Sequence, residues 1–311
     1  MMIQIGLLVL GFLLLIKGAN LFVDASVGIA EKLKVSKVII GLTIVAMGTG
    51  APEAVISITA AMRGSNALAI GNIVGSNIIN LLFIIGLCAV IRPMAIKLNE
   101  IAKDFWLSIA AAVLLLVFKF VGGYRIPWWG SLIFLIIFGL YMFFILRKAL
   151  GAGAIEVPPK KKRPFPILAV LAVLGCALIV AGGHFAVEGA THIATVLGVS
   201  ERVIGITIIA MGTSLPELIT SLVACKRGEN EFALGNVIGS SIFNILFILG
   251  LTGLIAPLEF ETALMFDTAM LIFGSLLTIL FVYTKKTLGR VEGGIMVAFY
   301  VSYIFFVLFA R

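Results

Sequence analysis

Ten mostly apolar segments follow one another along the chain, each near the length of about 20 residues that a helix needs to cross a bilayer. Hydrophobic residues make up 61% of the 311 positions and charged residues only 12%, too few polar groups to cover a soluble domain. The sequence therefore predicts an all-α polytopic membrane protein whose solvent is the lipid bilayer. The N-terminal segment lacks a basic stretch before its apolar run, so we interpret it as a span and not a cleaved signal. The ten segments lie near residues 3–23, 37–61, 67–91, 104–121, 128–146, 167–187, 201–224, 231–256, 264–284 and 291–310.

Charged residues predict how the spans are oriented. Residues 147–166, RKALGAGAIEVPPKKKRPFP, combine a basic run with four prolines, which is typical of a solvated linker. An N-terminus outside the cell places 17 of the 23 Lys and Arg residues in inner loops and 5 in outer ones. By the positive-inside rule we expect a plasma-membrane protein with both termini extracellular and the linker cytoplasmic. The net charge of +8 then belongs to the inner loops, and no nucleic-acid partner is expected.

An internal repeat divides the chain in two. Residues 41–87 align without a gap to residues 205–251, 164 positions later, and 26 of the 47 pairs are identical. Most identities fall on Gly, Pro, Ser, Thr, Asn and Glu, so shared hydrophobicity does not explain them. Each half holds five spans, and because five is odd the second half enters the membrane from the opposite face. We expect two inverted five-helix repeats, 1–146 and 167–311, with a site near the midplane on interrupted helices.

The second span carries residues that disfavour a helix beside a carboxylate. In AMGTGAPEAVIS, Pro52 has no N–H, and Gly48 and Gly50 loosen the same turn. The carbonyls of residues 46–48 are then partly freed, which at membrane depth is tolerated only in a protein interior or a water-filled cavity. Thr49 and Glu53 are one turn apart and share a helix face. The seventh span, AMGTSLPELITS, repeats the pattern with Thr213, Ser214, Pro216 and Glu217.

Polar stripes on the third and eighth spans complete a candidate ion site. GNIVGSNIIN and GNVIGSSIFN each place two amides and a hydroxyl at intervals of four residues. No His or Cys belongs to the set, and all-oxygen ligation suits Na⁺, Ca²⁺ or Mg²⁺ and not zinc or copper. The stripes are Asn72, Ser76 and Asn80 in the first half and Asn236, Ser240 and Asn244 in the second.

Not every polar residue in a span is expected to bind an ion. A carboxylate at the bilayer centre costs roughly 2.5–3.5 kcal/mol. Two at equivalent positions beside prolines therefore favour function, whereas Asn72 and Asn236 are expected to bond neighbouring helices. The remaining polar candidates are interpreted as surface, interfacial or core residues. They are Lys17, Asp24, Glu188, His184 and His192 at span ends, and Cys88, Cys176 and Cys225 in the core.

On these motifs the chain resembles the sodium/calcium exchanger family of the cation/Ca²⁺ antiporter superfamily. The likeness covers nearly the whole chain, since span number, linker and repeat spacing also agree. It implies ten helices in an inverted repeat and counter-transport of Ca²⁺ against Na⁺ by alternating access. By position it implies cation ligands at Thr49, Glu53, Ser76, Asn80, Thr213, Ser214, Glu217, Ser240 and Asn244, with backbone carbonyls at Ala46 and Ala210.

The chain departs from the family pattern at two of these positions. Gly50 stands where many members have Ser, so one hydroxyl ligand is missing from the first half. Asn244 stands where some members, including the potassium-dependent branch, have Asp, which favours potassium-independent exchange. The short linker leaves no room for the large regulatory domain of animal members, so the resemblance is to a minimal prokaryotic exchanger.

The two carboxylates carry −2 when ionised, which one Ca²⁺ or two Na⁺ would neutralise. We therefore expect the two cations to occupy the site in turn. A H⁺/cation antiporter could use the same carboxylates, and a cation channel remains a second alternative, although an inverted repeat favours a carrier. An intramembrane hydrolase would need an Asp pair, a Ser–His dyad or a zinc cluster, and none is found in the spans. We expect no enzymatic activity, no cofactor and no obligate protein partner.

Overall fold

The computed structural model describes residues 2–151, 163–199, 204, 208 and 210–309, and nearly all of them are helical. Within these residues, eight helices are long and apolar enough to cross a membrane. A ninth span forms if the bent pair Lys37–Thr49 and Ala51–Met62 is counted as one crossing. The predicted all-helical membrane class is therefore confirmed. The expected span at 201–224 begins among residues outside the described part, so the expected count of ten stays a prediction.

The order of elements in the first half recurs in the second. Short π-helical stretches, η, interrupt the α-helices at matching places. The first half contains α1 (Met2–Leu33), α2 (Lys37–Ile40), η1 (Gly41–Val45), α3 (Ala46–Thr49), α4 (Ala51–Met62), α5 (Asn66–Ile78), η2 (Ile79–Ile84), α6 (Ile85–Ile91), β1 (Met94–Ala95), α7 (Leu98–Val121), β2 (Arg125–Ile126) and α8 (Trp128–Gly151). The second contains α9 (Phe165–Val196), α11 (Ala210–Thr213), α12 (Leu215–Lys226), α13 (Asn230–Ile242), η4 (Phe243–Leu249), α14 (Gly250–Ile255), β3 (Leu258–Glu259), α15 (Ala263–Lys285), β4 (Thr287–Leu288) and α16 (Arg290–Phe309).

Several helices extend beyond the predicted boundaries. α1 and α9 have 32 residues each, so Asp24 and Glu188 lie within continuous helices, and their place at the ends of the spans stays a prediction. Both helices continue past the apolar stretch, because backbone hydrogen bonding does not stop where the hydropathy falls. For the same reason residues 147–151 belong to α8, although they were predicted as linker. His184 and His192 are exposed on α9, and Lys17 is exposed on α1, as expected for surface residues.

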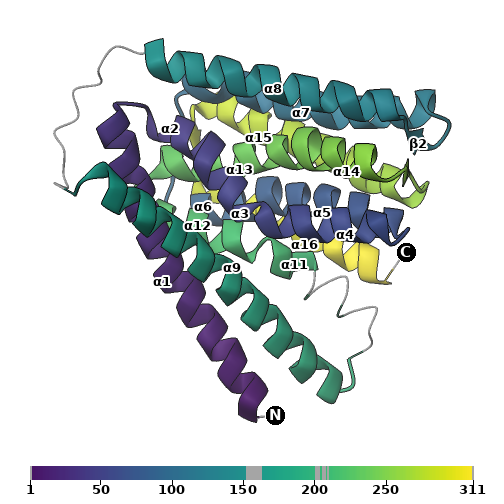
Figure 1. Ribbon diagram of the computed structural model, residues 1–311, viewed down its shortest axis with the longest axis horizontal. Helices are drawn as coiled ribbons and strands as arrows, with labels where there is room; N and C mark the ends of the chain where they lie inside the picture. Colours follow the sequence, from purple (N-terminus) through teal and green to yellow (C-terminus); the bar gives the residue numbers. More distant parts are fainter. Residues whose placement is uncertain (1, 152–162, 200–203, 205–207, 209, 310–311) are drawn as a thin grey trace.

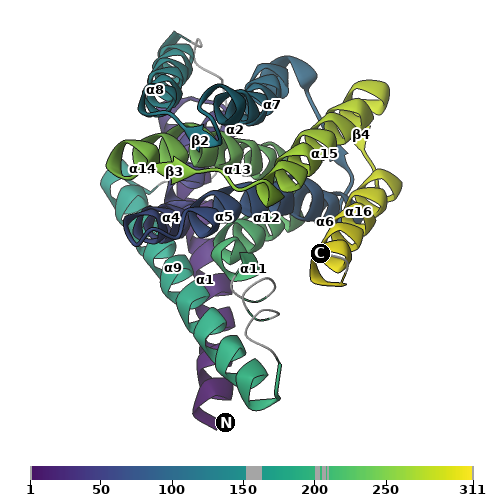
Figure 2. The ribbon, with the colours of Figure 1, turned by 90° about the vertical axis from the view of Figure 1, so that its right-hand side faces the viewer.

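Helices α1 and α9 form an antiparallel pair that lies obliquely against the remaining helices (Figures 1 and 2). Glycines let the two backbones touch. A Cβ added at Gly18 would lie 2.9 Å from the Gly175 carbonyl, and one added at Gly182 would lie 2.6 Å from the Leu15 amide nitrogen. Small residues of this kind allow the close backbone approach that drives association of membrane helices.

Two short antiparallel ladders join loops that belong to different halves. β1 pairs with β4 through Met94 and Leu288, and β2 pairs with β3 through Ile126 and Leu258. The first ladder joins two loops that were predicted to be cytoplasmic, and the second joins two that were predicted to be extracellular.

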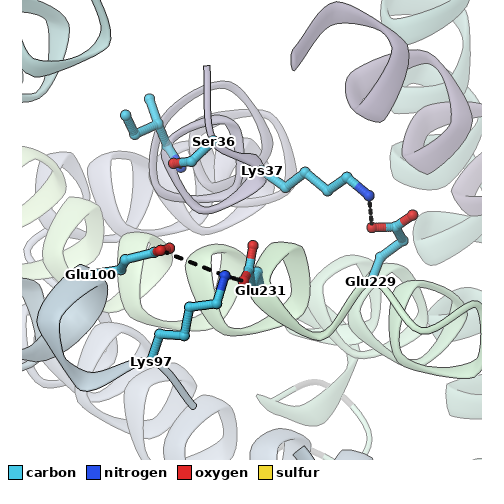
Figure 3. Close-up of polar contacts among 7 residues, drawn as sticks. Ser36, Lys37, Lys97, Glu100, Glu229 and Glu231 are labelled. Atoms are coloured by element: carbon cyan, nitrogen blue, oxygen red, sulfur yellow. Dashed lines mark hydrogen bonds and ion pairs between the residues drawn. The ribbon is translucent and has the colours of Figure 1, made fainter. Parts of the chain in front are cut away.

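Ion pairs tie the beginnings of α2 and α13 together, as Figure 3 shows. Lys37 at the start of α2 pairs with Glu229, and the Lys97 ammonium lies 2.7 Å from Glu231 and 3.6 Å from Glu100. Pairing with Glu231, and to a smaller degree with Glu100, raises the pKa of Lys97. These contacts line a cavity of about 470 Å³ at the end of the bundle where α1 meets α2.

Candidate cation-binding site

Two helices break next to the predicted carboxylates. The chain bends by 47° between Lys37–Thr49 and Ala51–Met62, where Gly50 leaves helical geometry with φ −79° and ψ 2°. Pro52 lies in the first turn of α4, where its missing N–H costs α4 itself no hydrogen bond, although it leaves the Gly48 carbonyl of the preceding turn without a backbone donor. In the second half, Ser214 at φ −88° and ψ 5° separates α11 from α12 in the same way. Both breaks leave the following carboxylate in the first turn of a new helix.

The break frees fewer carbonyls than expected. The Ala46 carbonyl still accepts a hydrogen bond from the Gly50 amide at 3.0 Å, because the break lies one turn further along. The Gly48 carbonyl does lose its partner, since Pro52 has no N–H, and the Cys176 thiol donates to it instead at 3.4 Å. Each carbonyl retains a second lone pair, so ligation by Ala46 stays possible only alongside its backbone bond.

The two carboxylates are the centre of the site. Glu53 in α4 and Glu217 in α12 are both 0% exposed, and they are near enough to interact electrostatically. The Ser214 hydroxyl, from the other half of the chain, lies 3.5 Å from Glu53 Oε1. Neither oxygen of Glu217 makes a hydrogen bond of ordinary geometry among the described residues, and the Thr49 hydroxyl is the side-chain group that interacts with it.

The predicted ligand residues carry a set of buried oxygens without protein partners. Burying a polar atom without a hydrogen bond costs roughly 1–3 kcal/mol, so natural proteins seldom leave several in one region. A cation supplies the missing partner, and Ca²⁺ takes about 6–8 oxygens. Among the described residues, the unpartnered oxygens here are Glu53 Oε2, Glu217 Oε1 and Oε2, Ser76 Oγ, Ser240 Oγ, Asn80 Oδ1 and Asn244 Oδ1.

The remaining predicted ligands lie around this set. Thr49 is fully buried, and its hydroxyl lies 3.1 Å from the Val45 carbonyl. Thr213 and Ser214 are also buried at the break between α11 and α12. The backbone of Ala210 begins α11. The folded chain thus places all of the predicted residues on the two broken helices and on the two helices that follow them.

Asn72 and Asn236 bond neighbouring helices, as the sequence predicted. Each donates from its amide nitrogen, over 3.0 Å, to the hydroxyl of a serine in the preceding helix of its own half, Ser57 or Ser221. The oxygen of Asn236 lies 3.3 Å from the Thr49 hydroxyl, and that of Asn72 lies 3.3 Å from the Thr213 hydroxyl. Both asparagines therefore connect a ligand residue of one half to the framework of the other.

Sequence reasoning missed Asn77 and the π-helical stretches. The Asn77 oxygen accepts from the Asn244 amide nitrogen at 2.9 Å, and its own amide nitrogen donates to the Ser241 carbonyl at 3.1 Å. This contact orients Asn244 so that its oxygen is left for a ligand. η2 and η4 include Asn80 and Asn244, and π-helical turns of this kind are frequent at functional sites. Asn77 could have been found as the only further polar residue in GNIVGSNIIN.

A crevice of about 370 Å³ approaches the site from the side of α9. Its lining includes Pro52, Pro216 and the site residue Thr213, together with His184 on α9. Most of the lining is apolar, and its polar side chains are His184 on α9 and Thr213 at the end of α11.

A pair of buried carboxylates, surrounded by unpartnered oxygens inside a bundle of apolar helices, defines a membrane transporter for cations. The model of the sodium/calcium exchanger protein family matches residues 3–147 and 167–309. The chain belongs to this family, and it is a cation/Ca²⁺ antiporter and not an enzyme.

Relatives agree over nearly their full length. The chain is 38% identical to the putative antiporter CaxA of Alkalimonas amylolytica, over 97% of this chain and 98% of the relative. It is 34% identical to the sodium/calcium exchanger MaX1 of Methanosarcina acetivorans, over 96% of each. A solved structure of the sodium-calcium exchanger NCX_Mj, soaked with 10 mM Na⁺ and zero Ca²⁺, superimposes with a TM-score of 0.84 at 33% identity, covering 100% of this chain and 99% of that one.

Proposed function

We propose that the chain exchanges Ca²⁺ for Na⁺ across the plasma membrane, and that both ions use the site formed by Glu53 and Glu217. The observation that carries this proposal is the set of seven buried, unpartnered oxygens on α4, α5, η2, α12, α13 and η4. Their number matches the coordination of one Ca²⁺. The two carboxylates balance either one Ca²⁺ or two Na⁺, so one kind of ion must leave before the other enters.

We further propose that the two halves form ten spans as an inverted repeat. The recurrence of the element order supports this. So does the pairing of strands from different halves, β1 with β4 and β2 with β3. Loops rich in Lys and Arg gather at one end, where Lys37, Lys97 and Arg227 all make ion pairs. We place this end in the cytoplasm and both termini outside.

In this orientation the crevice beside α9 is lined by residues of α4 and α9 that lead toward the predicted extracellular loops, and it reaches Thr213. We infer an outward-facing arrangement from this lining. On the cytoplasmic side, Lys37–Glu229 holds α2 to the start of α13, and the Arg227 guanidinium lies 2.6 Å from Asp24 on α1. Alternating access would require these pairs to separate before the ion could leave toward the cytoplasm.

Exchange is expected to be independent of potassium, because Asn244 contributes a neutral amide where the potassium-dependent branch has a carboxylate. The Asn77 contact makes this amide a fixed part of the site and leaves only its oxygen for a cation. The site therefore offers two formal negative charges among the described residues, and not three.

The test is ⁴⁵Ca²⁺ uptake into proteoliposomes loaded with Na⁺ and diluted into Na⁺-free buffer at fixed pH. We expect uptake that follows the sodium gradient, saturates with Ca²⁺ and is unchanged when K⁺ is omitted. Uptake driven by a pH gradient alone would instead establish a H⁺/cation antiporter. Flux that does not saturate and needs no counter-ion would establish a channel. Empty liposomes and the Glu53→Gln variant provide the background.

A further inference from the structure

Among the predicted ligand positions and the helix breaks beside them, the two halves of the site differ at position 50 of the first half. Ser214 in the second half corresponds to Gly50 in the first. The Ser214 hydroxyl lies 3.5 Å from Glu53 Oε1, whereas neither oxygen of Glu217 makes a hydrogen bond of ordinary geometry among the described residues, and the hydroxyl that interacts with it is that of Thr49. If the halves are related by the proposed symmetry, a hydroxyl at position 50 would lie beside Glu217.

An aromatic ring occupies the space next to Gly50. A Cβ built on Gly50 would lie 3.1 and 3.3 Å from two carbons of the Phe243 ring and 3.0 Å from the Ala46 carbonyl oxygen. At these separations a side chain at position 50 fits only if the ring shifts by a few tenths of an ångström. The ring is held by stacking on Phe247, at 4.9 Å between centroids and 12° between planes, and it also contacts Phe138. Phe243 is therefore fixed where a larger residue at position 50 would need space.

The other half carries a different pair. The residue that corresponds to Phe243 is Ile79, which lacks a ring, and it accompanies Ser214. The chain thus combines Ser with Ile on one side of the site and Gly with Phe on the other. A change at position 50 alone would create a clash, and a change at position 243 alone would leave a void.

We propose that Gly50 and Phe243 act as a matched pair that withholds a hydroxyl ligand from the Glu217 half and so weakens sodium binding there. Calcium is affected less, because its binding depends mainly on the two carboxylates, which are shared between the halves. The pair is therefore a determinant of selectivity between sodium and calcium. This inference rests on the proposed exchange of sodium for calcium at this site.

The deciding experiment is a direct binding measurement on purified protein in detergent. Sodium affinity is obtained from the rise in melting temperature with Na⁺ concentration in the absence of Ca²⁺, and from displacement of bound ⁴⁵Ca²⁺ by Na⁺. The double variant Gly50→Ser/Phe243→Ile supplies the hydroxyl together with the space it needs. The matched control Gly50→Ala/Phe243→Ile supplies the same Cβ and the same space without the hydroxyl.

We expect the serine variant to bind sodium about fivefold more tightly than the alanine control, which is the usual net value of one polar interaction. Calcium affinity should be the same in the two variants within about twofold. Equal sodium affinity in two folded variants would overturn the inference. If both double variants fail to fold, Ser214→Gly in the wild-type background tests the same hydroxyl in the other half, and it must weaken sodium more than calcium. Failure of the exchange proposal is distinguishable, because the wild type would then show no sodium-driven calcium flux at all.

Discussion

Replacing either central carboxylate with its neutral isostere should remove calcium binding without unfolding the protein. Glu53→Gln and Glu217→Gln keep the size of the side chain and change the charge of the site from −2 to −1. Both side chains are 0% exposed, so bulk water does not screen the charge that the substitution removes. The effect is therefore electrostatic and local.

The magnitude follows from Coulomb's law. Two unit charges about 4 Å apart attract by about 4 kcal/mol at an effective dielectric constant of 20, so a divalent ion and a carboxylate attract by about 8 kcal/mol. Measured losses on removing one partner of a buried charge pair are smaller than this, about 2–5 kcal/mol. A loss of about 3 kcal/mol corresponds to about a hundredfold in Kd.

Calcium affinity is measured by isothermal titration calorimetry of the purified protein in detergent, and folding by its melting temperature without calcium. The control is Glu292→Gln, which changes a carboxyl that is also buried but that accepts from the Gly289 amide at 3.1 Å, away from the site. The control should bind calcium like the wild type. A Kd for Glu53→Gln or Glu217→Gln within threefold of the wild type would refute the assignment of these carboxylates as ligands.

Three further predictions follow from contacts described above. Gly182→Leu forces a side chain against the backbone of α1 and should lower the melting temperature by several degrees, whereas Gly6→Leu, with nothing within 4 Å of its added Cβ, should not. Asn72→Ala removes the contacts that join hydroxyls of both halves and should weaken calcium about tenfold by calorimetry, while the far-ultraviolet circular dichroism stays unchanged. Lys97→Met should lower the melting temperature slightly at pH 7 through loss of the Glu231 pair. Because this pair raises the pKa of Lys97, the stabilisation that it gives is complete below pH about 10.5, the unfolded value, and disappears as pH rises through the higher folded pKa. The melting temperature of the variant should therefore fall below that of the wild type at pH 7 but not above the folded pKa. The same difference at both pH values would contradict the assignment.

Much of this candidate site could be predicted from the sequence, because ionisable and helix-breaking residues cost free energy in a membrane span. A carboxylate, a proline and glycines together in one span are seldom needed for structure alone. The second copy of the same pattern 164 residues later favours a functional role further. The resemblance then named the ligand positions. What it could not supply is the state of each atom, for instance that the Gly48 carbonyl is taken by Cys176 while the oxygens of Glu217 make no hydrogen bond of ordinary geometry among the described residues.

Other features depend on contacts between residues far apart in the chain. Lys119, near the end of the span predicted at 104–121, is 0% exposed at the end of α7, with its ammonium 4.7 Å from the centre of the Tyr124 ring and 5.5 Å from that of Phe260. No local pattern predicts this, because Phe260 comes from the other half of the chain. The motif GNIVGSNIIN shows Asn77 as a polar residue, but its role depends on contacts with Ser241 and Asn244 in the other half.

The glycine contacts between α1 and α9 have a mechanical consequence. Where the two backbones touch, the helices cannot bend or separate independently without losing that contact, so we expect them to move as one rigid unit, a lever. α1 also packs against α12, and α9 packs against α3 and α11, so the lever rests on both broken helices. A single displacement of this lever changes the cover on both sides of the site at once. Under the proposed exchange, opening one side and closing the other would then be the same movement, which would protect the membrane against a leak of ions through a doubly open state.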